Sequence, residues 1–178
     1  APGDVNNLIN NIKDYGAVGD GVKLNTVAIQ SAIDACSRDG GGTVLVPAGA
    51  FVTGSIELKD NVALHLAADA VLLGSENIDD YRLDWTWSEL RQWGCLIYAR
   101  GRRNLRIEGS GAIDGRGVIS VDGSPRGEDV NYGAGRRPRI LYFVECPNLV
   151  MRDVTLRNGG SWATHLVACD NMRIDGVT

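Results

Sequence analysis

The sequence predicts an all-β protein, a right-handed parallel β-helix whose first coil is covered by an N-terminal capping α-helix. Three observations lead to this fold. The chain has one segment with helical periodicity, close to its N-terminus. Short runs of β-branched and leucine residues follow, separated by Gly, Pro, Asp and Asn. A motif that contains asparagine then recurs at regular intervals, which is typical of a stack of coils.

The predicted helix follows Asn25 and Thr26, either of which can cap its N-terminus. Apolar residues recur at helical spacing from Ala28 to Cys36, and the glycines 40–42 end the helix. Its polar face carries Gln30, Asp34 and Arg38. The first coil of a β-helix exposes an apolar cross-section and unpaired strand edges. We therefore expect the apolar face of the helix to cover that end.

Internal repeats define the coils. The segments "CPNLVMRDVT" and "CDNMRIDGVT" align without a gap, and their asparagine fits one frame with two earlier ones. The four residues in this frame are Asn61, Asn104, Asn148 and Asn171. Their spacings fit two, two and one units of about 22 residues, the length of one coil of three short strands. A sandwich with accidental similarity is the alternative. We expect the four side-chain amides to occupy equivalent corners and to form a hydrogen-bonded ladder.

Length and composition exclude several classes of protein. The 178 residues are 44% hydrophobic and 22% charged, which is ordinary for one globular domain. The net charge of −4 and the lack of a basic stripe argue against a nucleic-acid partner. No apolar run is long enough to span a bilayer. The four cysteines and two histidines lack metal-ligand spacing, so we expect no metal and no cofactor.

Two cysteines occupy the same position in neighbouring repeats. Cys146 and Cys169 are expected to stack roughly 4.8 Å apart, the separation of hydrogen-bonded strands. Side chains on parallel, in-register strands orient the sulfurs poorly for a disulfide. We therefore expect both residues to be free, buried thiols.

Five segments, in order along nearly the whole chain, resemble signatures of the polygalacturonase family, the pectin-cleaving glycoside hydrolases on a parallel β-helix. These segments are "NIKDYGAVGDGVKLNTVAIQSAIDAC", "GGGTVLVPAGAFVTGSIELKDNVALHLAADAVLLGS", "IEGSGAIDGRG", "RPRILYFVEC" and "SWATHLVACDNMRIDGVT". The first two are less specific, because pectate-lyase-like β-helices and phage tailspikes share them. The resemblance implies a secreted or periplasmic hydrolase that cleaves α-1,4-galacturonosidic bonds of polygalacturonate or a related pectic oligosaccharide with inversion. From the charge and the short apolar runs we expect no nucleic-acid and no membrane partner.

The same resemblance places the catalytic residues outside this chain. Family members carry an Asn-Thr-Asp motif, which should fall within the coil after "DNMRIDGVT", beyond Thr178. Family members also carry an Asp-Asp pair, a Gly-His-Gly and an Arg-Ile-Lys further on. Two partial matches within this chain are rejected. Asn25 and Thr26 are followed by Val27 rather than Asp, and the Asp79-Asp80 pair lies in a loop well ahead of the expected catalytic pair. We therefore expect residues 1–178 to be a single domain of N-terminal coils, truncated before the catalytic coils and inactive alone.

Five residues are candidates for contact with a polyuronate, because aromatic rings stack on sugars and arginine forks bind carboxylates. They are Trp162, His165, Arg136, Arg137 and Arg139. The resemblance places Trp162 and His165 one coil before the expected catalytic aspartate, and local packing under a turn is the alternative. For the three arginines, which follow a glycine-rich loop, a solvated surface role is favoured over substrate contact.

Other residues favour structural roles. Trp85, Trp87 and Trp93 are expected to cover an edge of the core, with a roof over the groove as the alternative. His65 alternates with leucines on a strand and is expected to be structural. At the level of function, the alternatives are a calcium-assisted polysaccharide lyase and a non-catalytic carbohydrate-binding or tailspike-type module.

The last coils are expected to leave apolar side chains uncovered at Thr178. The residues concerned are Leu149, Met151, Met172, Ile174 and Val177. Unpaired strand edges and an open apolar cross-section favour association with another chain. We therefore expect residues 1–178 either to be marginally stable or to self-associate through the C-terminal end.

Overall fold

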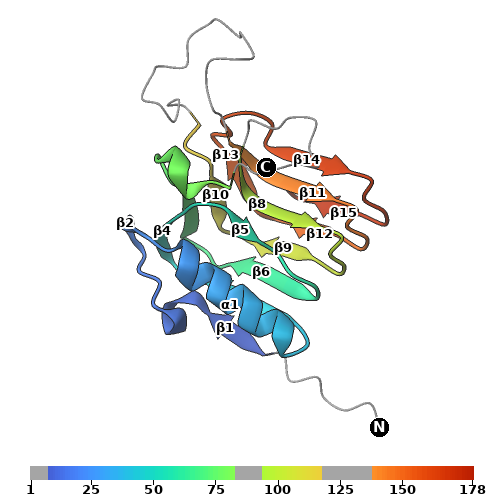
Figure 1. The fold of residues 1–178 in the computed structure, drawn as a ribbon, viewed down its shortest axis with the longest axis horizontal. Coiled ribbons are helices and arrows are strands. Elements are labelled where there is room, and N and C mark those ends of the chain that lie inside the picture. The colour runs from blue at the N-terminus through green and yellow to red at the C-terminus, as the bar shows by residue number, and fades with distance from the viewer. Residues whose placement is uncertain (1–7, 83–93, 118–137) are drawn as a thin grey trace, which may run out of the picture.

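The computed structural model describes residues 8–82, 94–117 and 138–178. Its strands form three parallel sheets, and after the N-terminal helix the chain adds one strand to each sheet in turn (Figure 1). The predicted right-handed parallel β-helix is confirmed. Sheet A contains β1 (Ile9–Asn11), β3 (Gly42–Val46), β6 (Val62–Leu66), β9 (Arg106–Gly109), β12 (Val150–Arg152) and β15 (Arg173–Asp175).

The other two sheets are built in the same way. Sheet B contains β2 (Asp20–Leu24), β4 (Gly49–Thr53), β7 (Ala70–Gly74), β10 (Ala112–Asp114) and β13 (Thr155–Arg157). Sheet C contains β5 (Ile56–Glu57), β8 (Cys95–Arg100), β11 (Arg139–Val144) and β14 (Thr164–Val167). The helices are α1 (Thr26–Arg38) and two short 3₁₀ turns, η1 (Ile12–Tyr15) and η2 (Ile78–Asp80). None of the described helices is long and apolar enough to cross a membrane.

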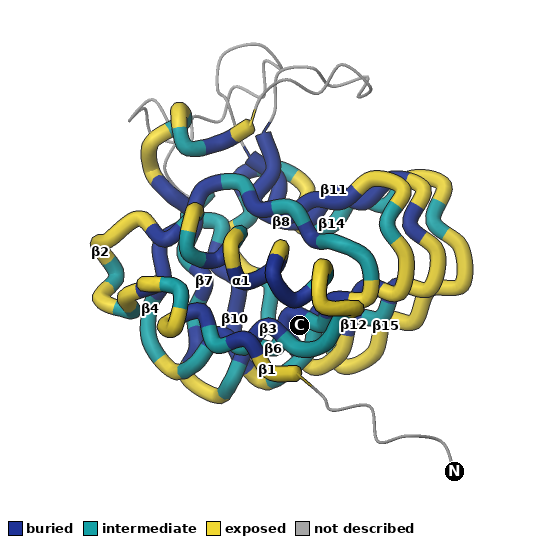
Figure 2. Tube along the Cα trace, turned by 60° about the horizontal axis from the view of Figure 1, so that its bottom comes forward, coloured by how far each residue is buried: buried dark blue, intermediate teal, exposed yellow. Residues whose placement is uncertain are grey.

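The core is a stack of apolar rows that run along the axis of the helix. In sheet A, for example, the strand register aligns Val44, Leu64, Ile107 and Met151, and all four are buried. Parallel strands place equivalent positions of neighbouring coils next to each other, so one alternating pattern per strand produces a continuous interior. Figure 2 shows buried residues on the inside of the coils and exposed residues at the stacked turns.

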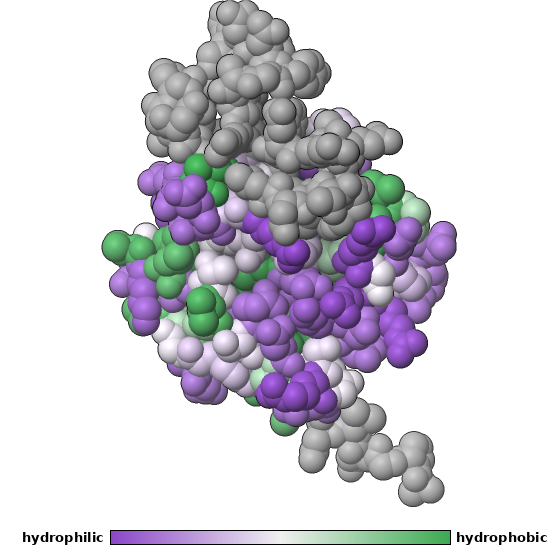
Figure 3. All heavy atoms as spheres, in the orientation of Figure 1, coloured by the Kyte–Doolittle hydropathy of each residue, from purple (hydrophilic) through white to green (hydrophobic). Residues whose placement is uncertain are grey.

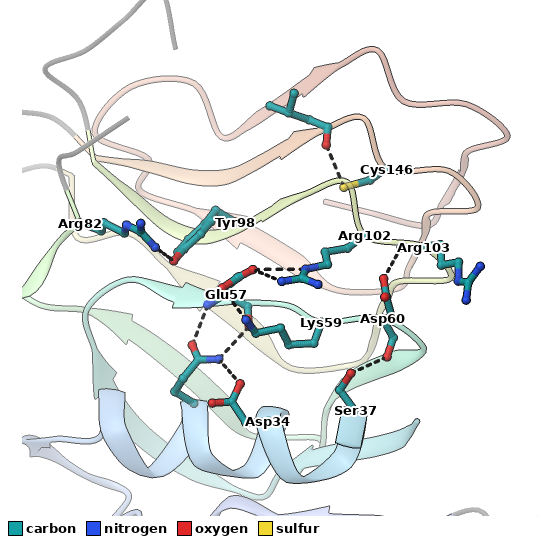
Figure 4. Close-up of polar contacts among 12 residues, drawn as sticks. Asp34, Ser37, Glu57, Lys59, Asp60, Arg82, Tyr98, Arg102, Arg103 and Cys146 are labelled. Carbon is teal, nitrogen blue, oxygen red and sulfur yellow. Dashed lines mark hydrogen bonds and ion pairs between the residues drawn. The ribbon is translucent and has the colours of Figure 1, made fainter. Parts of the chain in front are cut away.

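Helix α1 covers the N-terminal end of this core, as the sequence predicts. Its buried face includes Ile29, Ile33 and Cys36. Gln30 fixes the helix to sheet C, because its side chain accepts from the backbone N–H of Glu57 at 2.8 Å and donates to the carbonyl of Glu57 at 3.1 Å. The Ser37 hydroxyl donates to the backbone carbonyl of Asp60 at 3.1 Å (Figure 4). The helix is therefore held by polar contacts at its rim and by apolar contacts beneath it.

The expected side-chain cap at the start of α1 is wrong. Asn25 occupies the N-cap position, but its side chain makes no capping hydrogen bond. Its amide instead accepts from the backbone N–H of Val18 at 2.8 Å and donates to the carbonyl of Lys23 at 2.7 Å. The Thr26 hydroxyl accepts from the backbone N–H of Gly54 at 2.8 Å. Both side chains therefore tie the helix to neighbouring loops rather than to its own first turn.

The asparagine ladder is confirmed. Asn104 donates to Asn61 at 2.7 Å, Asn148 donates to Asn104 at 3.0 Å, and Asn171 donates to Asn148 at 2.5 Å. All four residues have φ between 53° and 62°. Asparagine is among the few side chains that tolerate this left-handed conformation, so one residue type both shapes the turn from sheet C to sheet A and links successive turns.

All four cysteines are free, as predicted for Cys146 and Cys169. Cys146 is buried and its thiol donates to the carbonyl of Val144 at 3.3 Å. Cys169 is only partly buried, which differs from the prediction, because less of the chain packs over its coil. Its thiol lies 3.4 Å from the carbonyl oxygen of Val167.

The expectation for the C-terminal coils is correct in part. Met172 is 43% exposed and Ile174 is 50% exposed. Leu149 and Met151, in contrast, are buried, so the expectation is wrong for them. The reason is that β15 pairs with β12 and covers it. Val177 lies between these extremes and packs against the core.

Candidate functional site

A row of in-register residues crosses sheet C. Glu57 pairs with Tyr98, Tyr98 with Tyr142, and Tyr142 with His165. The Tyr142 and His165 rings stack with their centroids 4.8 Å apart and an interplanar angle of 29°. Both tyrosines are nearly buried, and they pack with Cys95 and Val144 in a cluster separate from the main core. Sheet C therefore carries an aromatic row on its outer face.

Trp162 extends this row beyond the start of β14. Its ring meets the His165 ring edge-on, with centroids 4.7 Å apart and an interplanar angle of 77°. Trp162 is 58% exposed, so it presents a large aromatic surface to solvent. The structure thus brings together two of the five sequence candidates. Trp162 and His165 pack against each other. The exposure of Trp162 argues against the alternative that it packs beneath a turn.

Arg139 joins the same group, and the favoured solvated surface role is wrong for it. It begins β11 rather than ending a loop, and it is 1% exposed. Its guanidinium carbon lies 5.0 Å from the centroid of the Tyr142 ring and 5.8 Å from that of Trp162. Electron-rich ring faces stabilise a cation in such a position. Arg136, Arg137, Trp85, Trp87 and Trp93 lie outside the described residues.

The charge of Arg139 affects its neighbours. Burial lowers the pKa of His165, and the positive charge of Arg139 lowers it further. The imidazole is therefore held neutral, a form that has one donor and one acceptor nitrogen. Its Nδ1 is buried and has no hydrogen-bond partner within the described part of the chain. Burial also lowers the pKa of Arg139, although an arginine stays charged at any ordinary pH.

The N-terminal end of the row is an ion-pair cluster. Glu57 lies 2.7 Å from Lys59 Nζ and 2.9 Å from Arg102 Nη2 (Figure 4). Burial raises the pKa of the Glu57 carboxyl, but the hydrogen bonds from the two cations outweigh burial and hold its pKa below the ordinary value. Next to this cluster, Arg82 Nη1 donates to the Tyr98 hydroxyl at 2.8 Å. Each tyrosine of the aromatic row therefore has an arginine beside it, Arg82 at Tyr98 and Arg139 at Tyr142.

Two other titratable groups near the sheets are fixed in inert forms. Burial raises the pKa of the Cys95 thiol strongly, so it is no nucleophile. In sheet B, burial raises the pKa of the Asp114 carboxyl, but bonds from the Arg116 backbone, Asn158 and Arg157 outweigh it and lower the pKa. Across the described residues, no three His, Cys, Asp or Glu side chains are grouped as a metal site would need.

Sequence reasoning missed Tyr98 and Tyr142. A signal was available, because "CLIY" in β8 and "RILY" in β11 place a tyrosine at the fourth position of each strand. Aligning these segments as consecutive coils would have stacked the tyrosines next to His165. Arg82 had no comparable signal, because it lies outside the strands and its contact with Tyr98 on β8 depends on the placement of the segment after η2.

The chain is similar in sequence to known pectin-related proteins. A family profile described as rhamnogalacturonase A/epimerase, pectate lyase-like, matches residues 9–72. A candidate polygalacturonase of Vitis vinifera is 32% identical over 180 residues, which cover 93% of this chain and 35% of that protein.

Two solved structures are also similar. The family 28 exopolygalacturonase of Yersinia enterocolitica has a TM-score of 0.77 at 30% identity, covering 95% of this chain and 38% of that one. A candidate glycosyl hydrolase from Parabacteroides merdae has a TM-score of 0.79 at 30% identity, covering 96% of this chain and 74% of that one. This chain thus spans little more than a third of the length of the Vitis and Yersinia proteins.

Proposed function

The chain belongs to the polygalacturonase family of pectin-lyase-like β-helix proteins, and from this premise we propose that sheet C binds the polyuronate substrate of a pectin-degrading glycoside hydrolase. The names of the Vitis and Yersinia relatives support this class of activity. The substrate we propose is polygalacturonate or a related pectic oligosaccharide, cleaved at its α-1,4-galacturonosidic bonds with inversion. Because this substrate is a polymer of plant cell walls, we also propose that the protein acts in secreted or periplasmic form.

The observation that carries the proposal is the group of Arg139, Trp162 and His165. A uronate sugar has an apolar ring face and a carboxylate. The exposed Trp162 ring offers a stacking surface for the first. The positive charge of Arg139 lies 5.8 Å from that ring and attracts the second. The His165 ring meets the Trp162 ring edge-on and supports that stacking surface from β14.

The proposal assigns binding to this surface and proton transfer to other residues. Inverting hydrolysis needs a carboxylic acid and a carboxylate separated enough to admit water. Among the residues of β5, β8, β11 and β14, Glu57 alone is acidic. Its two cation partners keep it ionised, so it is unsuited to act as a general acid. We therefore propose that residues 1–178 alone bind the polymer and do not cleave it.

Calorimetric titration with galacturonic acid oligomers tests the proposal. Trp162→Ala should weaken binding about tenfold, the size expected for one lost stacking contact. Val27→Ala is the control, because Val27 is also a large exposed hydrophobic residue, 81% exposed, but lies on α1. Fully methyl-esterified oligomers have the same backbone without charge and should bind more weakly. Equal binding of both oligomers, or no effect of Trp162→Ala, would contradict the proposed site.

A second assay tests the chemistry. Incubation of residues 1–178 with polygalacturonate should release no reducing ends. Release of reducing ends would show that the acid and the base lie within these residues, against the proposal. Calcium-dependent release of unsaturated sugar ends would favour the lyase alternative.

A further inference from the structure

Sheet A carries a different kind of outer face. Two adjacent rows of side chains cross its last strands in register. One row runs through Arg106, Val150 and Arg173. The other runs through Glu108, Arg152 and Asp175. A hollow of about 120 Å³ opens between these strands. It is lined by Arg106, Val150, Met151, Arg152, Arg173 and Asp175.

The two rows differ in how their charges are satisfied. In the second row, Arg152 Nη2 lies 3.4 Å from Glu108 Oε2, so opposite charges on adjacent strands pair. In the first row, Arg106 has no hydrogen-bond or ion-pair partner within residues 8–82, 94–117 and 138–178. Arg173 has only Asp175, at 3.5 Å, and both side chains are mostly exposed. Two arginines of the first row are therefore available to an anion.

The spacing of these arginines suits an extended acidic ligand. Each lies one strand away from Val150, so their backbones are two strand separations apart, roughly 10 Å. Both arginine side chains line the hollow, and Val150 between them adds an apolar surface. An arginine fork binds a carboxylate with two parallel hydrogen bonds. The hollow thus offers charge at both sides and an apolar surface in the middle.

We propose that this hollow is a second binding site for an acidic polysaccharide, in which Arg106 and Arg173 hold sugar carboxylates and Val150 supports the apolar ring face. Sugars with carboxylates match this arrangement, because each unit combines an apolar face with one negative charge. The proposal rests on the proposed function for the class of polymer. It concerns a different sheet from the Trp162 surface, so each can fail independently.

The experiment compares four proteins by calorimetric titration with galacturonic acid oligomers. They are the parent, Trp162→Ala, the double variant Arg106→Gln/Arg173→Gln, and the combination of all three substitutions. The double variant in the Trp162→Ala background should bind about tenfold more weakly than Trp162→Ala alone, the size expected for two exposed arginine–carboxylate contacts. Added salt should reduce this difference, because it screens exposed charges.

A charge-matched control separates the hollow from net charge. Lys13→Gln/Arg38→Gln removes two exposed cations from η1 and α1, at the other end of the molecule. It should leave the affinity unchanged in the Trp162→Ala background. An equal loss in this control would overturn the proposal, as would tighter binding of an RNA homopolymer than of the galacturonic acid oligomers.

The outcomes also distinguish this inference from the proposed function. If Trp162→Ala alone abolishes all binding, the hollow contributes nothing and the inference is overturned while the sheet C site stands. If the arginine variant alone abolishes binding and Trp162→Ala has no effect, the hollow is supported and the proposed sheet C site fails.

Discussion

On the outer faces of sheets C and A, equivalent positions of successive coils form rows of side chains, and the chemistry of these rows differs between the two sheets. On sheet C, equivalent positions of successive coils are aromatic, and Tyr142 is only 4% exposed. On sheet A, one row of equivalent positions alternates in charge through Glu108, Arg152 and Asp175, and the row beside it places Val150 between two exposed arginines. On the face of the molecule that Figure 3 shows, hydrophilic residues gather over the middle, and hydrophobic residues lie over β2.

The difference between the two faces follows from the repeating coils of the β-helix. Parallel register places like positions of adjacent coils within contact distance, so one choice of residue is repeated as a row. A row of rings gains packing, whereas a row of like charges would repel and must alternate in sign. The outer face of sheet C therefore contributes to stability through burial, whereas the outer face of sheet A contributes little and leaves charges accessible to ligands.

The largest expected effect is on sheet C. Tyr142→Ala removes a nearly buried ring that stacks on His165, and it should lower the free energy of unfolding by about 3 kcal/mol. Urea unfolding measures this loss. Tyr142→Phe, which keeps the ring, should retain most of the stability. Equal losses in both variants would show that the hydroxyl, and not the aromatic row, provides the stabilisation.

The asparagine ladder joins the two sheets and should show the next largest effect. Asn104→Ala removes both ladder hydrogen bonds of Asn104 and places alanine at a φ of 56°. The expected loss is about 2 kcal/mol of unfolding free energy. Asn104→Gly removes the same bonds but tolerates the backbone, so it should recover about half of the loss. If glycine is no better than alanine, the backbone conformation is not what the asparagine provides.

The histidine of the sheet C row should make stability depend on pH. Burial and the charge of Arg139 lower the pKa of His165 in the folded protein, below the value of 6.5 for the unfolded chain. The unfolded chain then binds the proton more readily, so stability is complete above pH 6.5 and falls as pH decreases through 6.5 towards the folded pKa.

Nuclear magnetic resonance titration of His165 checks this prediction directly. Arg139→Met removes the nearby cation and should raise the midpoint. His165→Gln should remove the corresponding part of the pH dependence of urea unfolding. A midpoint above 6.5 in the parent protein would contradict the assigned causes.

The smallest effect is expected on sheet A. Arg152→Ala breaks the 3.4 Å contact with Glu108, but the arginine side chain is 48% exposed. Exposed ion pairs contribute little, so the loss of unfolding free energy should be about 0.5 kcal/mol or less. It should disappear in concentrated salt. A loss as large as that of Tyr142→Ala would remove the contrast between the two faces.

Local sequence patterns predicted the elements that depend on near neighbours. Helical spacing identified Ile29, Ile33 and Cys36, and these residues are buried. The recurring asparagine predicted the ladder, because a left-handed turn and a stacked amide both require that residue type. The free state of the cysteines followed from the same register argument.

The candidate site was less predictable. Trp162 and His165 were identified through a family resemblance, and the structure adds their edge-on contact. Arg139 was misjudged, because its position after a glycine-rich segment suggested solvent. Its burial depends on neighbouring strands, since β11 pairs with β8 on one side and β14 on the other.

The sequence by itself determined the coil period, the capping helix and the asparagine turns, because each follows from spacing within a short stretch of chain. Only the tertiary structure decided which outer rows became aromatic and buried and which stayed charged and open. Tyr98, Tyr142 and His165 meet because three different coils align in register. Arg106 and Arg173 approach Val150 for the same reason. The repeats indicate which positions stack, but how far a side chain is covered depends on contacts with strands and loops far apart in the chain, which no local pattern specifies.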